Sequence, residues 1–151
     1  MKTIMYLIGL FLAVFTAYGQ GSPTKTTLRQ SPVPDSLINS LIKVESGGND
    51  HALGDKHLAN KAYGPLQIRA HCLRDVNRRA GTRFTLAQIQ GNRPLSVWVC
   101  RTYLEMYATS KNIGRTPTLE DMARIWNGGP TGWKRKSTKG YGQRVLRLTK
   151  S

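Results

Sequence analysis

Apolar side chains recur at helical spacing along most of this chain, and the first clear case begins just after Pro34. The apolar stripe consists of Leu37, Ile38, Leu41, Ile42 and Val44. The segment Pro34-Asp35-Ser36 predicts the helix start, because an Asp or Ser side chain can accept the first unpaired backbone N–H groups. Gly47-Gly48 predicts the helix end, since glycine adopts the left-handed terminal conformation without steric cost.

The same spacing predicts five more helices. The first of them follows residues 63–68 and ends at Gly81, with a shared face of Ile68, Cys72, Val76 and Arg79. A short helix follows Thr85, and a long one starts at Asn92-Arg93-Pro94, where proline is tolerated in the first turn. The residues at roughly helical spacing in the long helix are Val97, Trp98, Arg101, Leu104, Met106 and Tyr107.

Two helices complete the pattern. Thr118–Asp121 has the form of a capping box, and the helix after it breaks at residues 128–130. The apolar positions of these two helices are Leu119, Met122, Ile125 and Trp126, then Tyr141, Val145 and Leu148. Residues 49–61 predict a loop or small irregular hairpin, and residues 134–140 predict a basic loop. The pattern therefore predicts a mainly α domain of short helices around one core.

The first 34 residues differ from this pattern. A lysine at position 2, an uncharged apolar run from Ile4 to Ala17 and the small residues of Ala17-Tyr18-Gly19 predict a secretory signal peptide over residues 1–19. The run is shorter than the about 20 residues that span a membrane, so we expect no stable membrane anchor. Residues 20–34, rich in Pro, Ser and Thr, predict an extended linker, and residues 35–151 the domain. The protein is expected to be secreted or periplasmic.

Charge narrows the choice of partners. The 151 residues include 23 Lys and Arg against 8 Asp and Glu, a net charge of +15, which attracts polyanions. Since the chain is expected to leave the cytoplasm, acidic cell-wall polymers are better candidates than nucleic acid. We expect a monomer that binds such material and no nucleic acid.

Two cysteines, Cys72 and Cys100, leave two alternatives open. In an oxidising compartment they predict one disulfide, but two buried free thiols would pack equally well as small apolar side chains. Two cysteines do not make a structural zinc site, and the three histidines are scattered. We therefore expect no metal and no cofactor.

One carboxylate lies on an apolar stripe. Glu45 projects from the apolar side of the first helix beside Gly47-Gly48, where desolvation raises the pKa of a carboxyl group. Such a group suits a general acid near neutral pH, although an exposed residue on a marginal helix face is the simpler alternative. Asp50 and Asp55, in the following loop, are the candidates for a second acid, whereas Asp75 and Glu105 read as surface charges.

Four segments around these residues follow one another in a familiar order. They are Glu45-Ser46-Gly47, Gly64-Pro65-Leu66-Gln67-Ile68, Ala123–Gly129, and Tyr141 with Val145. Together they resemble the signature blocks of lytic transglycosylases of the soluble type, relatives of goose-type lysozyme. Gly-Pro-Leu-Gln-Ile stands where that family usually has Gly-Leu-Met-Gln-Ile, and Trp126 stands where a tyrosine is common.

The resemblance implies a lysozyme-like α fold and cleavage of peptidoglycan between N-acetylmuramic acid and N-acetylglucosamine. It makes Glu45 the single catalytic acid and base, with a 1,6-anhydro sugar as product. It implies substrate hydrogen bonds for Ser46 and Gln67, sugar binding for Asn127, and a hydroxyl that orients the glutamate for Tyr141. Gln67 could instead satisfy loop backbone, Asn127 could cap a helix, and Tyr141 could be a core residue with its hydroxyl at the rim.

Two other functions compete with this one. A hydrolytic lysozyme would share the fold and Glu45 but use water placed by Asp50 or Asp55, because ordinary glycoside hydrolysis uses a pair of carboxylates. A secreted cationic binding or antimicrobial protein would depend on charge alone, as Lys134-Arg135-Lys136 and the basic C-terminus suggest. Replacement of Glu45 distinguishes the enzymes from the cationic protein.

Overall fold

The computed structural model describes residues 31–150, so the predicted signal peptide and residues 20–30 of the predicted linker lie outside the described residues. The described part is mainly helical, as the hydrophobic pattern predicts. In chain order the elements are α1 Asp35–Ser46, β1 Leu53–Gly54, β2 Ala62–Tyr63, α2 Ala70–Ala80, α3 Leu86–Ile89, α4 Arg93–Tyr107, α5 Ser110–Ile113, α6 Leu119–Gly128, the 3-10 helices η1 Gly132–Lys134 and η2 Lys136–Thr138, and α7 Lys139–Thr149.

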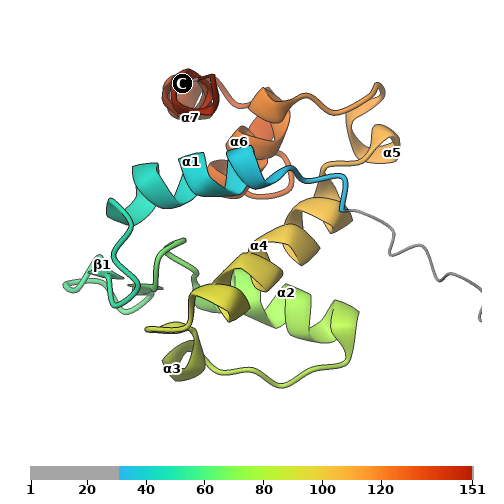
Figure 1. Cartoon of the computed structure of the whole chain (residues 1–151). Helices are drawn as coiled ribbons and strands as arrows, with labels where there is room; N and C mark the ends of the chain where they lie inside the picture. The colour runs from blue at the N-terminus through green and yellow to red at the C-terminus, as the bar shows by residue number, and fades with distance from the viewer. Residues whose placement is uncertain (1–30, 151) are drawn as a thin grey trace, which may run out of the picture.

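The helices pack around α1. Helices α6 and α7 contact each other and α1 on one side, and α4 lies on the other side with α2 beneath it (Figure 1). The short β1–β2 hairpin lies beyond the C-terminal end of α1 (Figure 1). Glu45, in the last turn of α1, therefore lies where the helices and the hairpin meet.

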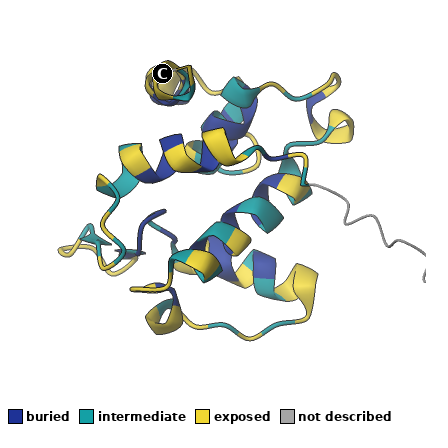
Figure 2. Ribbon diagram, viewed as in Figure 1, coloured by how far each residue is buried: buried dark blue, intermediate teal, exposed yellow. Residues whose placement is uncertain are grey.

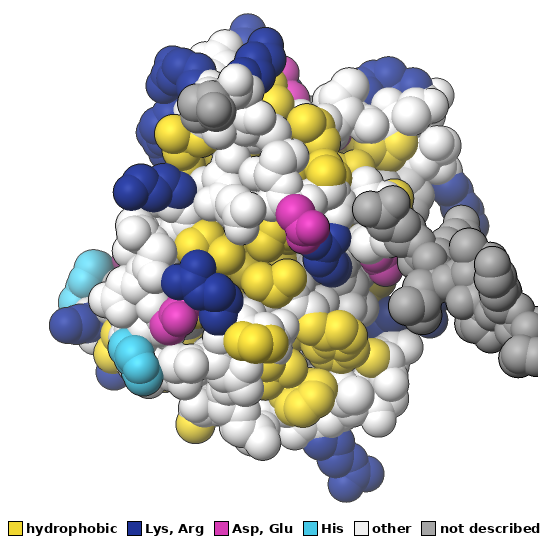
Figure 3. Space-filling model, viewed as in Figure 1, with side chains coloured by type: hydrophobic (Ala, Val, Ile, Leu, Met, Phe, Trp, Pro, Cys, Tyr) yellow, Lys and Arg dark blue, Asp and Glu magenta, His cyan; other side chains and the backbone are white. Residues whose placement is uncertain are grey.

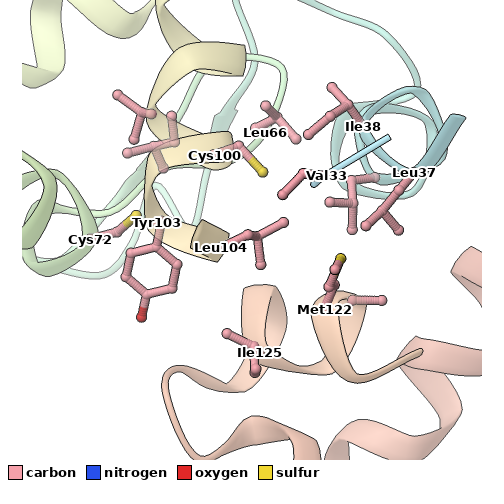
Figure 4. Packing of buried hydrophobic residues seen from close by; sticks show 14 of the residues in the cluster. Val33, Leu37, Ile38, Leu66, Cys72, Cys100, Tyr103, Leu104, Met122 and Ile125 are labelled. Atoms are coloured by element: carbon pink, nitrogen blue, oxygen red, sulfur yellow. The ribbon is translucent and has the colours of Figure 1, made fainter. Parts of the chain in front are cut away.

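One hydrophobic core joins all the long helices. Side chains from α1, α2, α4 and α6 converge with Leu66 of the loop before α2 (Figure 4). The buried sides of the helices face this centre and the exposed sides face solvent (Figure 2). Within it Leu37, Leu41, Leu66 and Leu104 are all fully buried.

Helix α1 forms as predicted except at its first residue. Leu37, Ile38, Leu41 and Ile42 are buried, and Gly47 ends the helix in the left-handed conformation with φ 65°. The N-cap, however, is Pro34, and no side chain caps the helix. Asp35 instead lies in the first turn, where it forms an ion pair with Arg101 of α4. The predicted side-chain cap is therefore wrong, because the carboxylate is drawn to a nearby guanidinium.

Residues 31–34, assigned to the linker from the sequence, pack on the domain. Val33 is 1% exposed and belongs to the core, and its carbonyl oxygen accepts a hydrogen bond from Arg101. A single valine between two prolines gives no periodic signal, so only the tertiary contacts reveal that the packed domain begins before Asp35.

The segment after α1 forms the small hairpin that its polar composition allows. Leu53 pairs with Tyr63 and Gly54 with Ala62 in an antiparallel ladder, and Tyr63 also bridges to Ile68. Gly54 leaves room for the Gln67 side chain, because a Cβ atom at position 54 would lie 2.0 Å from Oε1 of Gln67 and would force that side chain to move. The hairpin thus packs directly against the loop that carries Gln67.

The sequence pattern predicts the buried face of α4 only in part: Leu104 is buried and Val97 and Tyr107 pack against the core, as predicted. The buried residues are Ser96, Val99, Cys100, Tyr103 and Leu104, whereas Trp98 is 37% exposed. Apolar residues surround this helix, so periodicity alone cannot select the side that faces α2 and α6.

Two further predictions near the C-terminus need correction. Residues 134–140 are not a simple loop, because η2 forms at 136–138 and α7 begins at Lys139. The buried Thr138 hydroxyl donates a hydrogen bond of 2.7 Å to the carbonyl oxygen of Gly132 and holds this segment against η1. Leu148 is 41% exposed, since the last turn of α7 meets α1 through Thr149, whose hydroxyl donates to that of Ser40 at 3.1 Å.

Cys72 and Cys100 are both buried free thiols in the structure, so the possible disulfide is not formed and the second alternative holds. Cys72 lies on α2 and Cys100 on α4 (Figure 4). Burial raises the pKa of Cys72 to about 12 and that of Cys100 well above its ordinary value. Both residues therefore act as small apolar side chains in the core.

Candidate functional site

A cleft of about 530 Å³ opens at the C-terminal end of α1. Its walls come from α1, the hairpin loop, the loop before α2, α2 itself, α4 and the end of α6. The lining residues that carry polar or aromatic chemistry are Glu45, Asp55, Gln67, Arg69, His71, Asp75, Tyr103, Trp126, Asn127 and Arg135.

Glu45 is the carboxyl group that lines the cleft at the end of α1. Helix α1 buries its apolar stripe against the core, so the side chain one turn after Leu41 enters the cleft from a hydrophobic wall. Burial raises the pKa of Glu45, while the Tyr141 hydrogen bond, the charges of Arg69 and Arg144, and the Trp126 side chain lower it. Burial is the largest of these effects, so the net shift favours a protonated carboxyl group.

Tyr141 holds this carboxyl group in place. The tyrosine lies in the first turn of α7, is 7% exposed, and donates a hydrogen bond of 2.5 Å from Oη to Oε1 of Glu45. Burial and the neighbouring carboxylate raise the pKa of Tyr141, so its hydroxyl stays a proton donor. The structure thus gives Tyr141 the orienting contact that the family resemblance implies, and it is also a core residue.

Gln67 lies in the cleft in a strained backbone conformation. Its φ is 51°, which is rare for a residue with a side chain, and its Nε2 donates to the carbonyl oxygen of Gly64 at 3.0 Å. The backbone bonds from Tyr63 to Ile68 and back, both 2.9 Å, close the turn around it. Gln67 therefore both satisfies loop backbone and lines the cleft. A strained backbone conformation of this kind persists only where the surrounding contacts hold it in place, as the hydrogen bonds around Gln67 do.

Asp55 brings a second carboxylate into the same cleft. It occupies the turn of the hairpin with φ 50°, and its carboxylate forms an ion pair with Arg69 at the start of α2. Arg69 also donates to the carbonyl oxygen of Asn60. The Arg69 guanidinium therefore links the hairpin loop to the wall of the cleft. Its positive charge acts on both acids, because it pairs with Asp55 and also lowers the pKa of Glu45.

The other candidate second acid lies elsewhere. Asp50 does not line the cleft; its Oδ1 lies 2.8 Å from Nε of Arg93 at the start of α4. Its carbonyl oxygen accepts a backbone hydrogen bond from Gly91 at 2.8 Å. Asp50 therefore fastens the loop after α1 to α4, which is a structural role.

The two remaining residues of the predicted site differ. The Ser46 hydroxyl donates to the carbonyl oxygen of Pro65 at 2.9 Å and accepts from the amide of Gly48 at 3.2 Å, and Ser46 does not line the cleft. Asn127 is exposed in the last turn of α6 and lines the cleft. The C-cap of α6 is Gly129, so capping does not explain Asn127.

Sequence reasoning missed several residues of the cleft. Asp75 was read as a surface charge, yet it faces the cleft and accepts a hydrogen bond of 3.2 Å from the Tyr107 hydroxyl. Arg69 and Arg135 also line it, although the basic segment around Arg135 read as solvated. Asp75 follows the apolar Cys72 by three residues on α2, and residues three apart lie on the same side of a helix. The helical period could therefore have predicted that Asp75 does not face solvent.

Neither a metal site nor a membrane-spanning helix is found in the part of the chain that the structure describes. Within residues 31–150, no group of three or more His, Cys, Asp or Glu side chains is placed to hold a metal ion. None of the helices in that range is long and apolar enough to cross a membrane.

The chain is similar in structure to solved lysozymes. No protein-family model matches the chain, and no curated protein matches it. A structure of Aeromonas hydrophila PliI in complex with Meretrix lusoria lysozyme matches with a TM-score of 0.64 and 25% identity, over 76% of this chain and 89% of that one. Tapes japonica lysozyme matches with a TM-score of 0.62 and 19% identity, over the same shares. The chain therefore has a lysozyme-like fold.

Proposed function

We propose that this protein cleaves the glycan strands of peptidoglycan outside the cytoplasm, with Glu45 as the catalytic acid. The observation that carries the proposal is Glu45 itself, half-buried at the cleft with a raised pKa and held by the Tyr141 hydroxyl. A raised pKa extends the pH range over which this carboxyl group is protonated and can donate its proton to a glycosidic oxygen.

The reaction begins when Glu45 protonates the oxygen between N-acetylmuramic acid and N-acetylglucosamine. As the bond breaks, positive charge develops at the anomeric carbon of the sugar, and the leaving sugar departs as a neutral alcohol. Glu45, now a carboxylate, accepts a proton from the group that attacks this carbon. Tyr141 stabilises the carboxylate during this interval by its hydrogen bond.

We infer that the attacking group is water and that the enzyme is a hydrolase. Asp55 supports this reading, because it is a second carboxylate in the same cleft and glycoside hydrolysis ordinarily uses two. Arg69 holds Asp55 in its position at the hairpin turn. The solved structures that share the fold are named as lysozymes, which agrees with this inference.

A lytic transglycosylase is the second candidate. The ion pair between Asp55 and Arg69 favours it, since a carboxylate already neutralised by a guanidinium is less able to stabilise positive charge on a sugar. The muramic 6-hydroxyl would then attack its own anomeric carbon, and an intramolecular nucleophile of this kind has a large effective-molarity advantage over water. The four sequence blocks around Glu45, Gln67, Asn127 and Tyr141 also support it.

The remaining contacts suit an acidic glycan. Asn127 and Gln67 line the cleft and can form hydrogen bonds with sugar substituents. Arg135 at the cleft, within a chain of net charge +15, suits the carboxylates of peptidoglycan and acidic wall polymers. Ser46 is committed to the loop backbone, so we assign it no substrate contact.

The first experiment replaces the acid. Glu45→Gln is nearly isosteric, and loss of the general acid should lower the rate of wall lysis by about two to four orders of magnitude. Glu120→Gln, in the first turn of α6 and away from the cleft, is the control and should retain full activity. Near-normal lysis by folded Glu45→Gln protein would refute the proposal, and bacterial killing that survives in it would assign the activity to charge alone.

The second experiment separates the two enzymes. Asp55→Asn and Asp50→Asn each remove one arginine-paired carboxylate, the first inside the cleft and the second outside it. A hydrolase should lose rate by roughly a hundredfold or more in Asp55→Asn alone and release reducing ends. Anhydro ends from the wild type, with activity retained in both variants, would assign the transglycosylase.

A further inference from the structure

We propose that the catalytic cleft continues along α2 and α4 into a distal groove that binds sugars of the glycan strand beyond the cleaved bond. The distal groove is a hollow of about 520 Å³ centred on Trp98, and the proposal rests on the function proposed above. The residues of the groove that the argument uses are Arg79, Trp98, Thr102, Glu105, Met106 and Tyr107.

The distal groove is connected to the cleft by a smaller hollow. Asp75 lines both the cleft and this intermediate hollow, which has a volume of about 320 Å³. Arg79, Met106 and Tyr107 line both the intermediate hollow and the distal groove. The hydrogen bond from Tyr107 to Asp75 therefore joins a residue of the cleft to a residue of the distal groove, across the intermediate hollow.

The helices set the length of this path. Asp75 and Arg79 are one turn apart on α2, about 6 Å at the ordinary rise per residue. Tyr103 of the cleft and Trp98 are separated by roughly 7 to 8 Å along α4. These spans are of the size of one or two sugar rings, so a strand that fills the cleft needs only a short extension to reach Trp98.

The chemistry of the distal groove suits a sugar. Trp98 is 37% exposed, and the edge contact with Phe84, at 5.6 Å between ring centres, limits how the indole can move. Figure 3 shows exposed hydrophobic side chains gathered over α4, the helix that carries Trp98. An aromatic face packs on the C–H face of a sugar, and the neighbouring Arg79, Thr102 and Glu105 supply hydrogen-bond donors and acceptors for hydroxyl groups.

A wall glycan is favoured as the occupant over a second copy of this chain. The groove shares lining residues with the intermediate hollow, and that hollow shares Asp75 with the cleft, so the groove lies on the path of a strand leaving the cleft. The net charge of +15 on the whole chain repels a second copy but attracts a strand that carries carboxylates.

The test measures binding without catalysis. In the Glu45→Gln background, the dissociation constants of a chitotriose, a chito-octaose and a purified peptidoglycan glycan strand are compared by calorimetry for three further variants. Trp98→Ala removes the aromatic face, Trp98→Phe retains a ring, and Leu148→Ala removes an equally exposed apolar side chain outside the groove. Circular dichroism checks that each variant is folded.

We expect Trp98→Ala to weaken binding of the octasaccharide and the glycan strand by roughly three- to tenfold, with trisaccharide binding unchanged. Trp98→Phe should recover most of the affinity, and Leu148→Ala should have none of this effect. Equal affinities for the long ligands with and without Trp98, or equal losses for short and long ligands, would overturn the proposal. Concentration-dependent dimerisation that Trp98→Ala abolishes would also overturn it, because the groove would then belong to a second copy. Failure of wild-type wall lysis tests the proposed function separately, since this assay uses no turnover.

Discussion

The hydrogen bond from Tyr141 to Glu45 gives the sharpest prediction, because Tyr141→Phe removes one oxygen atom from a buried pair. Burial raises the pKa of Glu45 and the Tyr141 hydroxyl opposes that rise. A hydrogen bond to a charged group contributes about 1.5–3 kcal/mol, and one pKa unit corresponds to about 1.4 kcal/mol. Loss of the hydroxyl should therefore raise the pKa of Glu45 further.

The pH–rate profile of wall lysis measures this shift. A general acid acts in its protonated form, so activity falls as pH rises through the pKa of Glu45. In Tyr141→Phe the alkaline limb of the profile should move to higher pH, with a lower maximum rate. Tyr103→Phe is the matched control, because Tyr103 also lines the cleft and is buried but forms no hydrogen bond with Glu45 among the described residues.

Stability gives an independent readout of the same bond. A carboxyl group whose folded pKa is raised contributes stability below its unfolded pKa, and this contribution is lost as pH rises through the folded pKa. Urea unfolding should therefore show a larger deficit for Tyr141→Phe at alkaline pH, by about 1.5–3 kcal/mol, than at acidic pH, by about 1 kcal/mol. In Glu45→Gln protein this difference between the two pH values should vanish. An unshifted alkaline limb, together with a deficit independent of pH, would refute the reasoning.

Three further predictions follow from other parts of the molecule. Gly132→Ala should lower the free energy of unfolding by about 1–3 kcal/mol, because its Cβ would lie 2.0 Å from the Arg124 carbonyl oxygen. Gly140→Ala is the control and should be neutral or stabilising, because the space around Gly140 is open. Equal melting temperatures for the two variants would contradict this. Cys72 and Cys100 should react with a thiol reagent only after denaturation, since burial raises the pKa of both, and rapid labelling of folded protein would show that the core is open. Binding to isolated cell walls should weaken steeply as salt is added, because a net charge of +15 acts on a polyanion by screened attraction; a binding constant that salt leaves unchanged would attribute binding to sugar contacts alone.

The sequence by itself determined the local features of this protein. The spacing of Leu37, Ile38, Leu41 and Ile42 and the glycines after Glu45 were enough to predict α1, its buried face and its end. The same reasoning predicted the raised pKa of Glu45, because a helix end that buries its neighbours also desolvates the carboxyl group between them. Thr118 with Asp121 predicted the start of α6 from a bond between residues three apart. Each of these features depends on contacts within one or two turns.

Only the tertiary structure decided which distant residues meet at the site. Asp50 and Asp55 are equivalent in sequence as polar residues of one loop, yet Arg93 draws the first toward α4 and Arg69 holds the second in the cleft. The buried side of α4 depended on where α2 and α6 pack, and the apolar residues around that helix did not select it. Asp75 and Arg135, which read as surface charges, became lining residues of the cleft for the same reason. A local sequence pattern reports helical periodicity and propensity. Ion pairs and helix packing join residues that are far apart in the sequence, so they depend on contacts that form only when the chain folds.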